Sequence, residues 1–352
     1  MQPIAVHPSE MSTRGRELVG AVVTRELRAG PAKMRFRKGQ VITGADLATL
    51  AEATEAVHAA RLDPEDVHEN DAGTRLAAMI AGQGVMARQP VQSRVNMVAT
   101  HKGLVRVDRE ALLAMNARPE IGVFTVPDRL PVAAGKIIAG AKISPVAVPA
   151  AVLDELEREL AALDHPVVQV KPFVSHCAGV VVTEGLNEKI RDRFESVVRQ
   201  KIGWYGGSIL RFDYVADETA AVAGAMRAQL ADGATILLAA GGHMLDPLDP
   251  TQRALPEIGA SITRLGAPAH PGSMFWLGHV DERDVPIVSL ASCSMYSRST
   301  VADLVLPWVM AGERVTSADI ATIGYGGMLD RDMGWRFPPY DVESVDEPDE
   351  DE

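Results

Sequence analysis

The sequence has few cysteines and no long apolar run, and both absences exclude classes of protein. Its two cysteines, Cys177 and Cys293, lie outside any Cys-x-x-Cys pair and cannot form a disulfide framework. The longest apolar stretch, residues 131–153, is interrupted by Lys136 and Lys142, which argues against a transmembrane helix. Residues 1–18 lack the apolar segment of a signal peptide. We therefore expect a cytoplasmic protein without a membrane partner.

Aromatic residues and basic charge are also scarce. Only 5% of the residues are aromatic, so the core must consist mainly of aliphatic side chains. The net charge is −12, and eight acidic residues but no basic one lie in residues 341–352. The rest of the chain carries 39 acidic and 35 basic residues and is close to neutral. Nucleic-acid binding needs a face rich in Lys and Arg, so we expect no nucleic-acid partner.

Several catalytic and nucleotide-binding motifs are missing from the sequence. It contains no Gly-x-Gly-x-x-Gly, no phosphate-binding Gly-x-x-x-x-Gly-Lys-Ser/Thr, no Gly-x-Ser-x-Gly and no His-Glu-x-x-His. The residues that would support a nicotinamide dehydrogenase, a P-loop kinase, a serine hydrolase or a zinc protease are therefore absent.

The hydrophobic pattern divides the chain into four segments. Residues 1–17 are polar and aperiodic, which predicts a flexible leader. Residues 18–165 mix short strand-like and helix-like runs, typical of an α+β domain. Residues 166–330, after the Asp164–Pro166 boundary, alternate strands with helices. Residues 331–352 are predicted to be an acidic disordered tail.

The alternation beyond residue 166 predicts an open, mostly parallel sheet. Strands are expected at 179–183, 208–215, 234–240, 274–277 and 285–290, with helices at 187–202, at 218–231 and from Thr300 onward. In such sheets, ligands bind at the carboxyl ends of the strands, where the strand order reverses. The loops after the strands are therefore the places to look for a site.

These loops carry residues suited to a phosphate-bearing ligand. Glycines let backbone N–H groups approach a ligand, and hydroxyl groups at a helix start add donors near the positive end of the helix dipole. Paired aspartates could hold a divalent cation or position a polar ligand. The candidate binding residues are Thr183, Glu184, Gly241, Gly242, Asp246, Pro271, Gly272, Ser273, Ser292, Cys293 and Ser294, with Asp246 and Asp249 as candidate metal ligands.

Each of these features also has a purely structural interpretation. Gly241-Gly242 is compatible with an ordinary turn after a strand. The two Asp-Pro pairs from Asp246 to Pro250 are equally good turn or helix-capping chemistry. Hydroxyl groups before a helix often serve only as caps, and Cys293 is compatible with a buried, inert thiol. Both interpretations of each feature therefore stay open at this point.

The order of these loop residues resembles the molybdopterin-binding domain of molybdenum-cofactor biosynthesis proteins. The family has a Gly-Gly loop with a later Asp and Thr, here Gly241-Gly242, Asp249 and Thr251, and a Pro-Gly pair before a strand, here Pro271-Gly272. The chain looks closest to bacterial members associated with molybdenum hydroxylases. Further matching stretches are Lys38-Gly39, Arg61–Val67, Arg94–Asn96, Lys142–Pro145, Gly266–Gly272, Ser292–Ser294 and Asp303–Gly312, so the resemblance spans roughly residues 18–315.

The resemblance implies a three-layer α/β/α domain with a mostly parallel sheet, preceded by the mixed α+β domain. It implies that molybdopterin or its nucleotide form binds at the carboxyl ends of the strands, with Asp249 as the catalytic carboxylate and Mg²⁺ as an accompanying ion. The implied reaction class is molybdotransferase-like or nucleotidyltransferase-like. Other cofactor-assembly proteins or a molybdenum hydroxylase are the implied partners, and homo-oligomers occur among related proteins.

The chain departs from the family pattern in the loops themselves. His243-Met244 follows Gly241-Gly242 where the enzymes have Thr or Ser, and Ser273 stands where molybdotransferases have a lysine. Binding through backbone N–H groups tolerates these changes, whereas the changes argue against catalysis of metal insertion or adenylation. Two alternatives to an enzyme of cofactor assembly therefore stay open: a non-catalytic carrier or chaperone of the cofactor, and a nucleotide-cleaving or amidase-like enzyme that shares the domain.

Overall fold

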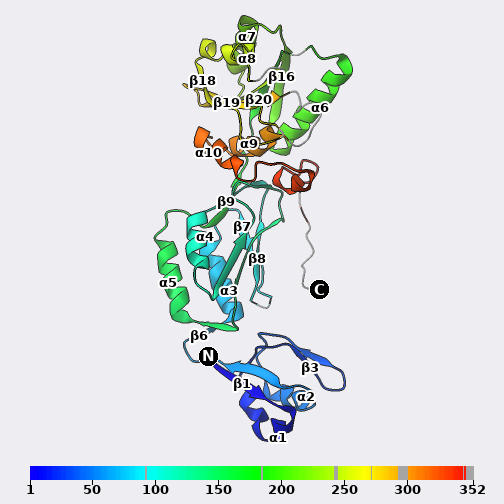
Figure 1. Cartoon of the computed structure of the whole chain (residues 1–352), viewed down its shortest axis with the longest axis vertical. Coiled ribbons are helices and arrows are strands. Elements are labelled where there is room, and N and C mark those ends of the chain that lie inside the picture. The colour runs from blue at the N-terminus through cyan, green and yellow to red at the C-terminus, as the bar shows by residue number, and fades with distance from the viewer. Residues whose placement is uncertain are drawn as a thin grey trace.

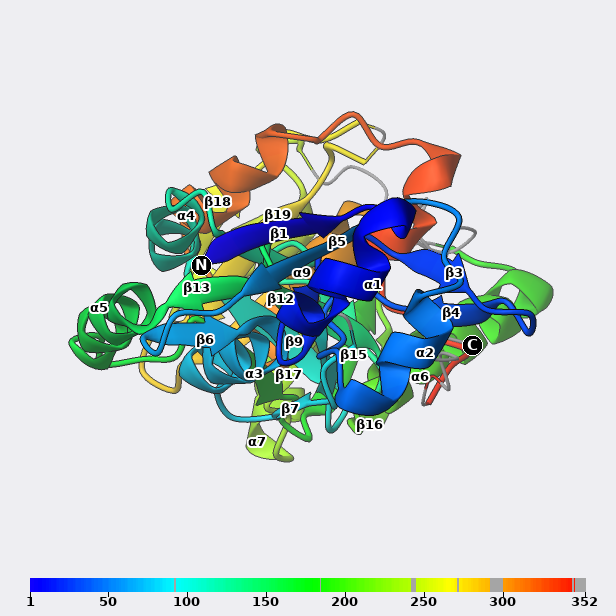
Figure 2. The ribbon, with the colours of Figure 1, turned by 90° about the horizontal axis from the view of Figure 1, so that it is seen from below.

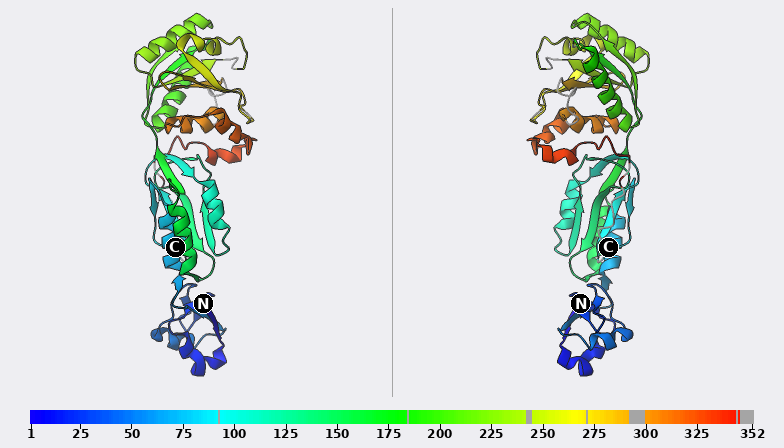
Figure 3. Two further views of the ribbon diagram at one scale, coloured as in Figure 1. Left: turned by 90° about the vertical axis from the view of Figure 1, so that its left-hand side faces the viewer. Right: turned by 90° about the vertical axis from the view of Figure 1, so that its right-hand side faces the viewer.

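The computed structural model describes residues 1–91, 93–183, 185–241, 245–270, 272–291, 300–343 and 345. They form three units stacked along one long axis (Figures 1 and 3). The segment expected to be one domain, residues 18–165, is split between the first two units, and each has its own buried cluster. The sequence pattern is turn-rich throughout this segment and does not show the split. The split depends on which strands pair with one another.

The N-terminal unit is built on a small antiparallel sheet with the strand order β1-β5-β2. The expected flexible leader was wrong: β1 (Gln2–Val6) pairs with β5 along its whole length, and Val6 and Met11 are buried in the core of the unit. Figure 2 shows β1 lying beside β5. Pro3 is tolerated because β1 is an edge strand. The other elements are α1 (Met11–Arg14), β2 (Val22–Val23), β3 (Leu27–Ala29), β4 (Met34–Phe36), α2 (Leu47–Leu50) and β5 (Val57–Arg61).

The middle unit combines antiparallel sheets with three helices. One sheet has the order β10-β12-β8-β7, and a second has the order β11-β9-β14. The expected boundary at residue 166 was placed too early, since Val168 and Val170 of β14 pair with β9 and are buried in the middle core. The elements are β6 (Asp66–His68), α3 (Glu69–Ile80), β7 (Val85–Ala87), β8 (Val95–Ala99), β9 (Gly103–Val107), α4 (Arg109–Asn116), β10 (Ile121–Thr125), β11 (Pro131–Val132), β12 (Ile137–Ile143), β13 (Ala147–Pro149), α5 (Ala150–Ala161) and β14 (Val168–Pro172).

The C-terminal unit contains a six-stranded sheet with the order β16-β15-β17-β20-β19-β18. The pairs among β16, β15, β17 and β20 are parallel, whereas β19 pairs antiparallel with both of its neighbours. Val180 and Val182 are buried in one cluster with α6 and α9, and Val181 is buried in another with α7. The strands are β15 (Cys177–Val182), β16 (Ser208–Tyr214), β17 (Ile236–Gly241), β18 (Ala260–Leu265), β19 (Trp276–Val280) and β20 (Val285–Ala291); the helices are α6 (Glu188–Trp204), α7 (Thr219–Ala231), α8 (Pro250–Arg253), α9 (Val301–Met310) and α10 (Ser317–Ala321).

Helices therefore pack against both faces of this mixed, partly parallel sheet. The alternation of buried faces along β15 explains why its sequence is an unbroken apolar run. Most of these elements lie within a few residues of the expected positions, but β18 was not expected. Within the described residues, no helix is both long enough and apolar enough to cross a bilayer.

The expected disordered tail was also wrong for the residues that the structure describes. Residues Arg331–Arg336 form a 3₁₀ helix, η7, and the chain then runs along the junction of the middle and C-terminal units. Trp204 Nε1 donates to the Val342 carbonyl at 2.9 Å, and the Val345 N–H donates to the Ala134 carbonyl at 2.7 Å. Tyr340 packs against the C-terminal core. The number of acidic residues does not predict these contacts, because the apolar and aromatic residues that lie between the acidic ones make them.

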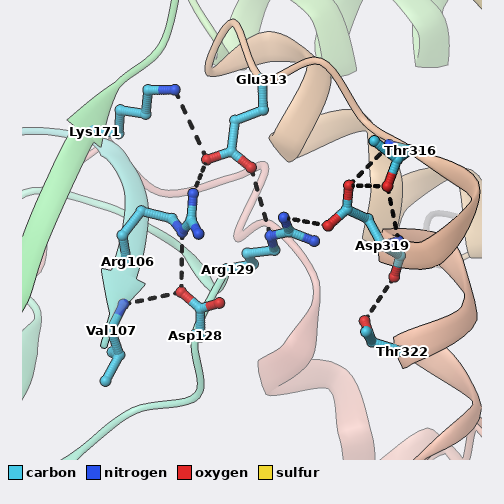
Figure 4. A network of polar contacts seen from close by, with 9 residues as sticks. All are labelled: Arg106, Val107, Asp128, Arg129, Lys171, Glu313, Thr316, Asp319 and Thr322. Carbon is cyan, nitrogen blue, oxygen red and sulfur yellow. Dashed lines mark hydrogen bonds and ion pairs between the residues drawn. The ribbon is translucent and has the colours of Figure 1, made fainter. Parts of the chain in front are cut away.

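A network of ion pairs joins the middle unit to the C-terminal unit (Figure 4). Glu313, which is nearly buried, forms an ion pair with Arg106 and lies 3.5 Å from Arg129 Nε and 3.8 Å from Lys171 Nζ. Asp128 accepts a hydrogen bond from Arg106 Nε at 3.1 Å. Because Arg106, Arg129 and Lys171 lie in the middle unit and Glu313 follows α9, these charges hold the two units together.

Candidate functional site

The carboxyl ends of three parallel strands lie side by side in the C-terminal unit. In the register of the sheet, Val182 of β15 is opposite Ala240 of β17, and Gly241 is opposite Ala291 of β20. The Thr183 N–H donates to the Ala240 carbonyl at 3.0 Å, which places Thr183 beside the end of β17. Two of the expected binding residues, Thr183 and Gly241, therefore come from segments far apart in the sequence and lie at one edge.

This edge includes the point where the strand order reverses. From β15 the chain crosses through α6 to β16 on one side, whereas β17 lies on the other side of β15. The connections that leave β15 and β17 therefore run in opposite directions, and this arrangement opens a crevice between neighbouring loops in α/β sheets. The other expected residues of these loops, Glu184, Gly242, Ser292, Cys293 and Ser294, lie outside the described residues, as does Pro271.

Asp249 is a buried helix cap. Its Oδ1 accepts a hydrogen bond from the Thr251 N–H at 2.8 Å and another from the Thr251 hydroxyl, at the start of α8. The side chains of Asp249 and Thr251 are both buried. The expected catalytic carboxylate thus performs the capping role that was its structural alternative, and Thr251 is its partner.

Asp246 lies in the same loop but is exposed. Its Oδ1 accepts from the Leu248 N–H at 2.9 Å, and its carbonyl accepts from the Asp249 N–H at 2.9 Å. These bonds form a tight turn that leads into α8. In the part of the chain that the structure describes, no group of three or more His, Cys, Asp or Glu side chains is arranged to hold a metal ion.

Gly272 and Ser273 belong to a loop at the same edge of the sheet. The loop is closed by hydrogen bonds from the Gly266 N–H to the Phe275 carbonyl at 2.8 Å and from the Ala267 N–H to the Ser273 carbonyl at 3.1 Å. Gly272 has a φ of +108°, and a Cβ there would lie 3.0 Å from Val301 Cγ2. Only glycine adopts this φ readily and avoids the close contact with Val301. The loop therefore packs directly against the first residue of α9.

A buried polar cluster lies at the first turn of α9. Asp303 accepts hydrogen bonds from the Thr300 N–H and hydroxyl, both at 2.8 Å, and so caps the start of the helix. Lys201 Nζ of α6 lies 2.8 Å from Asp303 Oδ1 and 2.9 Å from Oδ2. The Tyr340 hydroxyl donates to Asp303 Oδ1 at 2.6 Å. The helix start is thus fixed by a charge pair and by the C-terminal segment.

The phenols in this cluster stay neutral. Burial raises the pKa of Tyr340 well above its usual value, and the nearby Asp303 carboxylate raises it further. Burial likewise raises the pKa of Tyr205, whose hydroxyl lies 3.4 Å from that of Tyr340. Sequence reasoning missed Lys201 and Tyr340 as members of this cluster. The available signal was a lysine on the apolar face of α6, next to Val198 and Ile202.

Comparison with known proteins adds little to this description. No protein-family model matches the chain, and no curated protein matches it. Among solved structures, it is similar to a chain described as a molybdenum cofactor biosynthesis protein from Corynebacterium diphtheriae, with 16% identity and a TM-score of 0.28, over 44% of this chain and 100% of that chain. A TM-score this low establishes neither a shared fold nor a shared function.

Proposed function

We propose that this protein binds molybdopterin, or its nucleotide form, at the carboxyl edge of the six-stranded sheet, and that it acts in the assembly or handling of the molybdenum cofactor. The observation that carries the proposal is the meeting of the ends of β15, β17 and β20 where the strand order reverses. The order of the family-like loop residues over roughly residues 18–315 supports the choice of ligand.

Backbone groups are the proposed phosphate ligands. Gly241 ends β17 and Ala291 ends β20, so the glycine and serine segments that follow them start from neighbouring strands. Main-chain N–H groups of such segments bind phosphate without needing a lysine, which makes Ser273 in place of a basic residue tolerable for binding. Gly272 contributes indirectly, because it lets its loop pack against the start of α9.

Asp246 and Asp249 offer carboxylate oxygens, the ligand type that Mg²⁺ accepts together with substrate phosphates. When bound, Mg²⁺ would neutralise charge on the ligand's phosphate oxygens. Asp246 is the proposed contact with the ion, because its side chain is exposed in the loop. Asp249 is proposed to hold the loop through its cap on α8 and, in an enzyme, to serve as the catalytic carboxylate.

A non-catalytic carrier or chaperone is the second candidate function. The observation that favours it is the engagement of Asp249, whose Oδ1 already accepts two hydrogen bonds from Thr251 in a buried position. Such a carboxylate serves the fold without any reaction. A carrier would bind and release the cofactor unchanged, with a cofactor-assembly protein or a molybdenum hydroxylase as its partner.

Titration of the purified protein with molybdopterin tests the proposal. The variant Gly242→Arg should lose binding, since its long side chain would occupy the loop directly after β17. The matched control is Gly224→Arg in α7, where an added Cβ would meet nothing within 4 Å, and it should bind normally. Absence of binding by the wild type, with and without nucleotide and Mg²⁺, would overturn the proposed function.

The same preparation separates the enzyme from the carrier. An enzyme should consume molybdate or nucleotide in the presence of molybdopterin, and Asp249→Asn should abolish this turnover while it preserves the cap. A carrier should release unchanged ligand, and Asp249→Asn should then have no effect on either binding or release. Turnover of a nucleotide that carries no pterin would instead favour a nucleotide-cleaving enzyme.

A further inference from the structure

A small cavity of about 60 Å³ lies where the middle unit meets the C-terminal unit. Its lining comes from the loop of residues 127–130, from α9, from the 3₁₀ helix η6 (Thr322–Gly324) and from η7. The volume is several times the roughly 10–15 Å³ that one water molecule requires, so a small polyatomic ion fits. The principal lining side chains are Arg129, Leu130, Leu304, Trp308, Trp335 and Arg336.

Two buried hydrogen-bond donors of this lining have no acceptor. Trp308 is 6% exposed, and its Nε1 makes no hydrogen bond. Arg129 Nε is also buried without a hydrogen-bond partner. It lies 3.5 Å from Glu313 Oε2, close enough for electrostatic attraction but without hydrogen-bond geometry. Since nearly all buried polar groups in folded proteins are paired, two such donors at one cavity indicate a missing acceptor.

The Arg129 guanidinium is held firmly in this position. Arg129 has a φ of +63°, a left-handed conformation that is unusual for a residue other than glycine. Its Nη2 donates to Asp319 Oδ1 at 2.7 Å (Figure 4), and its guanidinium carbon lies 4.5 Å from the centre of the Trp308 ring. The strained backbone is therefore compensated by contacts that aim the side chain at the junction.

The charges around the cavity are not balanced. The carboxylates of Asp128, Glu313 and Asp319 are all engaged with Arg106, Arg129 or Lys171. Arg336 donates to the Gly326 carbonyl and, among the described residues, forms no ion pair. The charged residues of the lining itself are the guanidinium groups of Arg129 and Arg336 and the carboxylate of Asp128, which leaves one positive charge in excess in the lining.

We infer that this cavity binds a small oxyanion, of the size of phosphate or sulfate, through Trp308 Nε1, Arg129 Nε and the Arg336 guanidinium. A single water molecule fits less well, because its oxygen has two lone pairs and can accept from at most two of the three donor groups. An anion accepts from all three groups and neutralises the excess charge. Because the lining comes from two units, the bound anion strengthens the junction between them.

The test is a calorimetric titration of the full-length protein with phosphate, with sulfate and with acetate, at constant ionic strength maintained with chloride. Tryptophan fluorescence, to which Trp308 and Trp335 contribute at the cavity, is recorded in parallel. We expect one saturable site for phosphate and sulfate. Saturation by acetate alone would identify a carboxylate-bearing ligand and overturn the tetrahedral oxyanion.

Trp308→Phe keeps an aromatic ring but removes the N–H group, and we expect about tenfold weaker binding, typical of a lost hydrogen bond to a charged ligand. The control is Trp276→Phe, because Trp276 also has a buried, unpaired Nε1 but lies in a different core cluster. Arg336→Gln, at the rim, should also weaken binding and covers the case in which Trp308→Phe does not fold. No saturable binding by the wild type, or equal losses in Trp308→Phe and Trp276→Phe, would overturn the inference.

Discussion

Replacing Lys201 by Met tests how the start of α9 is held. Lys201 and Asp303 are almost completely buried, and the Lys201 ammonium lies within 3 Å of both carboxylate oxygens. Methionine fills a similar volume but leaves the Asp303 carboxylate buried with no opposite charge. Removal of one partner of such a pair typically costs about 3–5 kcal/mol. The Tyr340 hydroxyl and the Thr300 hydrogen bonds are retained in the variant, so we expect a loss at the lower end of that range.

The matched control is Lys189→Met, which makes the same substitution at an exposed position of the same helix. It should change the free energy of unfolding by less than about 0.5 kcal/mol, as surface substitutions usually do. Urea unfolding measures the difference, and hydrogen exchange of the α9 amides assigns it to the C-terminal unit, because a chain of three units need not unfold in one step.

A double variant, Lys201→Met with Asp303→Leu, separates the charge pair from the cap. It removes the unpaired charge but also the cap on α9, so it should be more stable than Lys201→Met alone and less stable than the wild type by about 1 kcal/mol or more. If Lys201→Met costs no more than Lys189→Met, the pair does not act as a buried charge pair and the reasoning is refuted. A double variant less stable than Lys201→Met would show that capping by Asp303 is the larger contribution.

Three further predictions concern other contacts. Asp249→Ala should cost about 1 kcal/mol by thermal or urea unfolding, whereas Asp249→Asn, which can still cap α8, should cost much less; equal losses would contradict the capping role. Deletion of residues 337–352 should lower Tm, because it removes the Tyr340, Val342 and Val345 contacts, and an unchanged Tm would contradict their role. Hydrogen bonds with Asp164 and Asp108 raise the pKa of His165, so its stabilising effect should be complete below about pH 6.5 and disappear as pH rises through the raised pKa. The Tm difference between the wild type and His165→Gln should therefore shrink from pH 6 to pH 9, and a constant difference would refute this assignment.

Local patterns were enough to locate most elements of the C-terminal unit. The apolar run at residues 234–240 indicated a strand buried on both faces, which the structure has at Ile236–Gly241, and the spacing of Phe194, Val198 and Ile202 indicated a helix. These signals survive in the sequence because each depends only on neighbours within one or two turns or on alternate residues. Capping by Asp249, one of its two open interpretations, could be proposed from the sequence for the same reason, since its partner is two residues away.

Contacts between distant residues could not be predicted in this way. The segment expected to be a leader is a strand because it pairs with residues 57–61. The C-terminal segment is held by hydrogen bonds to the Ala134 carbonyl and the Asp303 carboxylate. The ion pair of Arg106 with Glu313 joins residues 207 positions apart in the sequence, and that of Lys201 with Asp303 joins residues 102 positions apart. No local propensity specifies such partners.

The sequence by itself therefore determined the alternation of strands and helices and the loops that follow the strands, because hydrogen bonding and side-chain periodicity are local. Only the tertiary structure decided that the N-terminal half forms two units, that the ends of β15, β17 and β20 meet, and that a partly open cavity lies beside Arg129 and Trp308 at the ion-paired junction. Those features depend on burial, which becomes definite only when distant segments pack and exclude water from charges that then need partners.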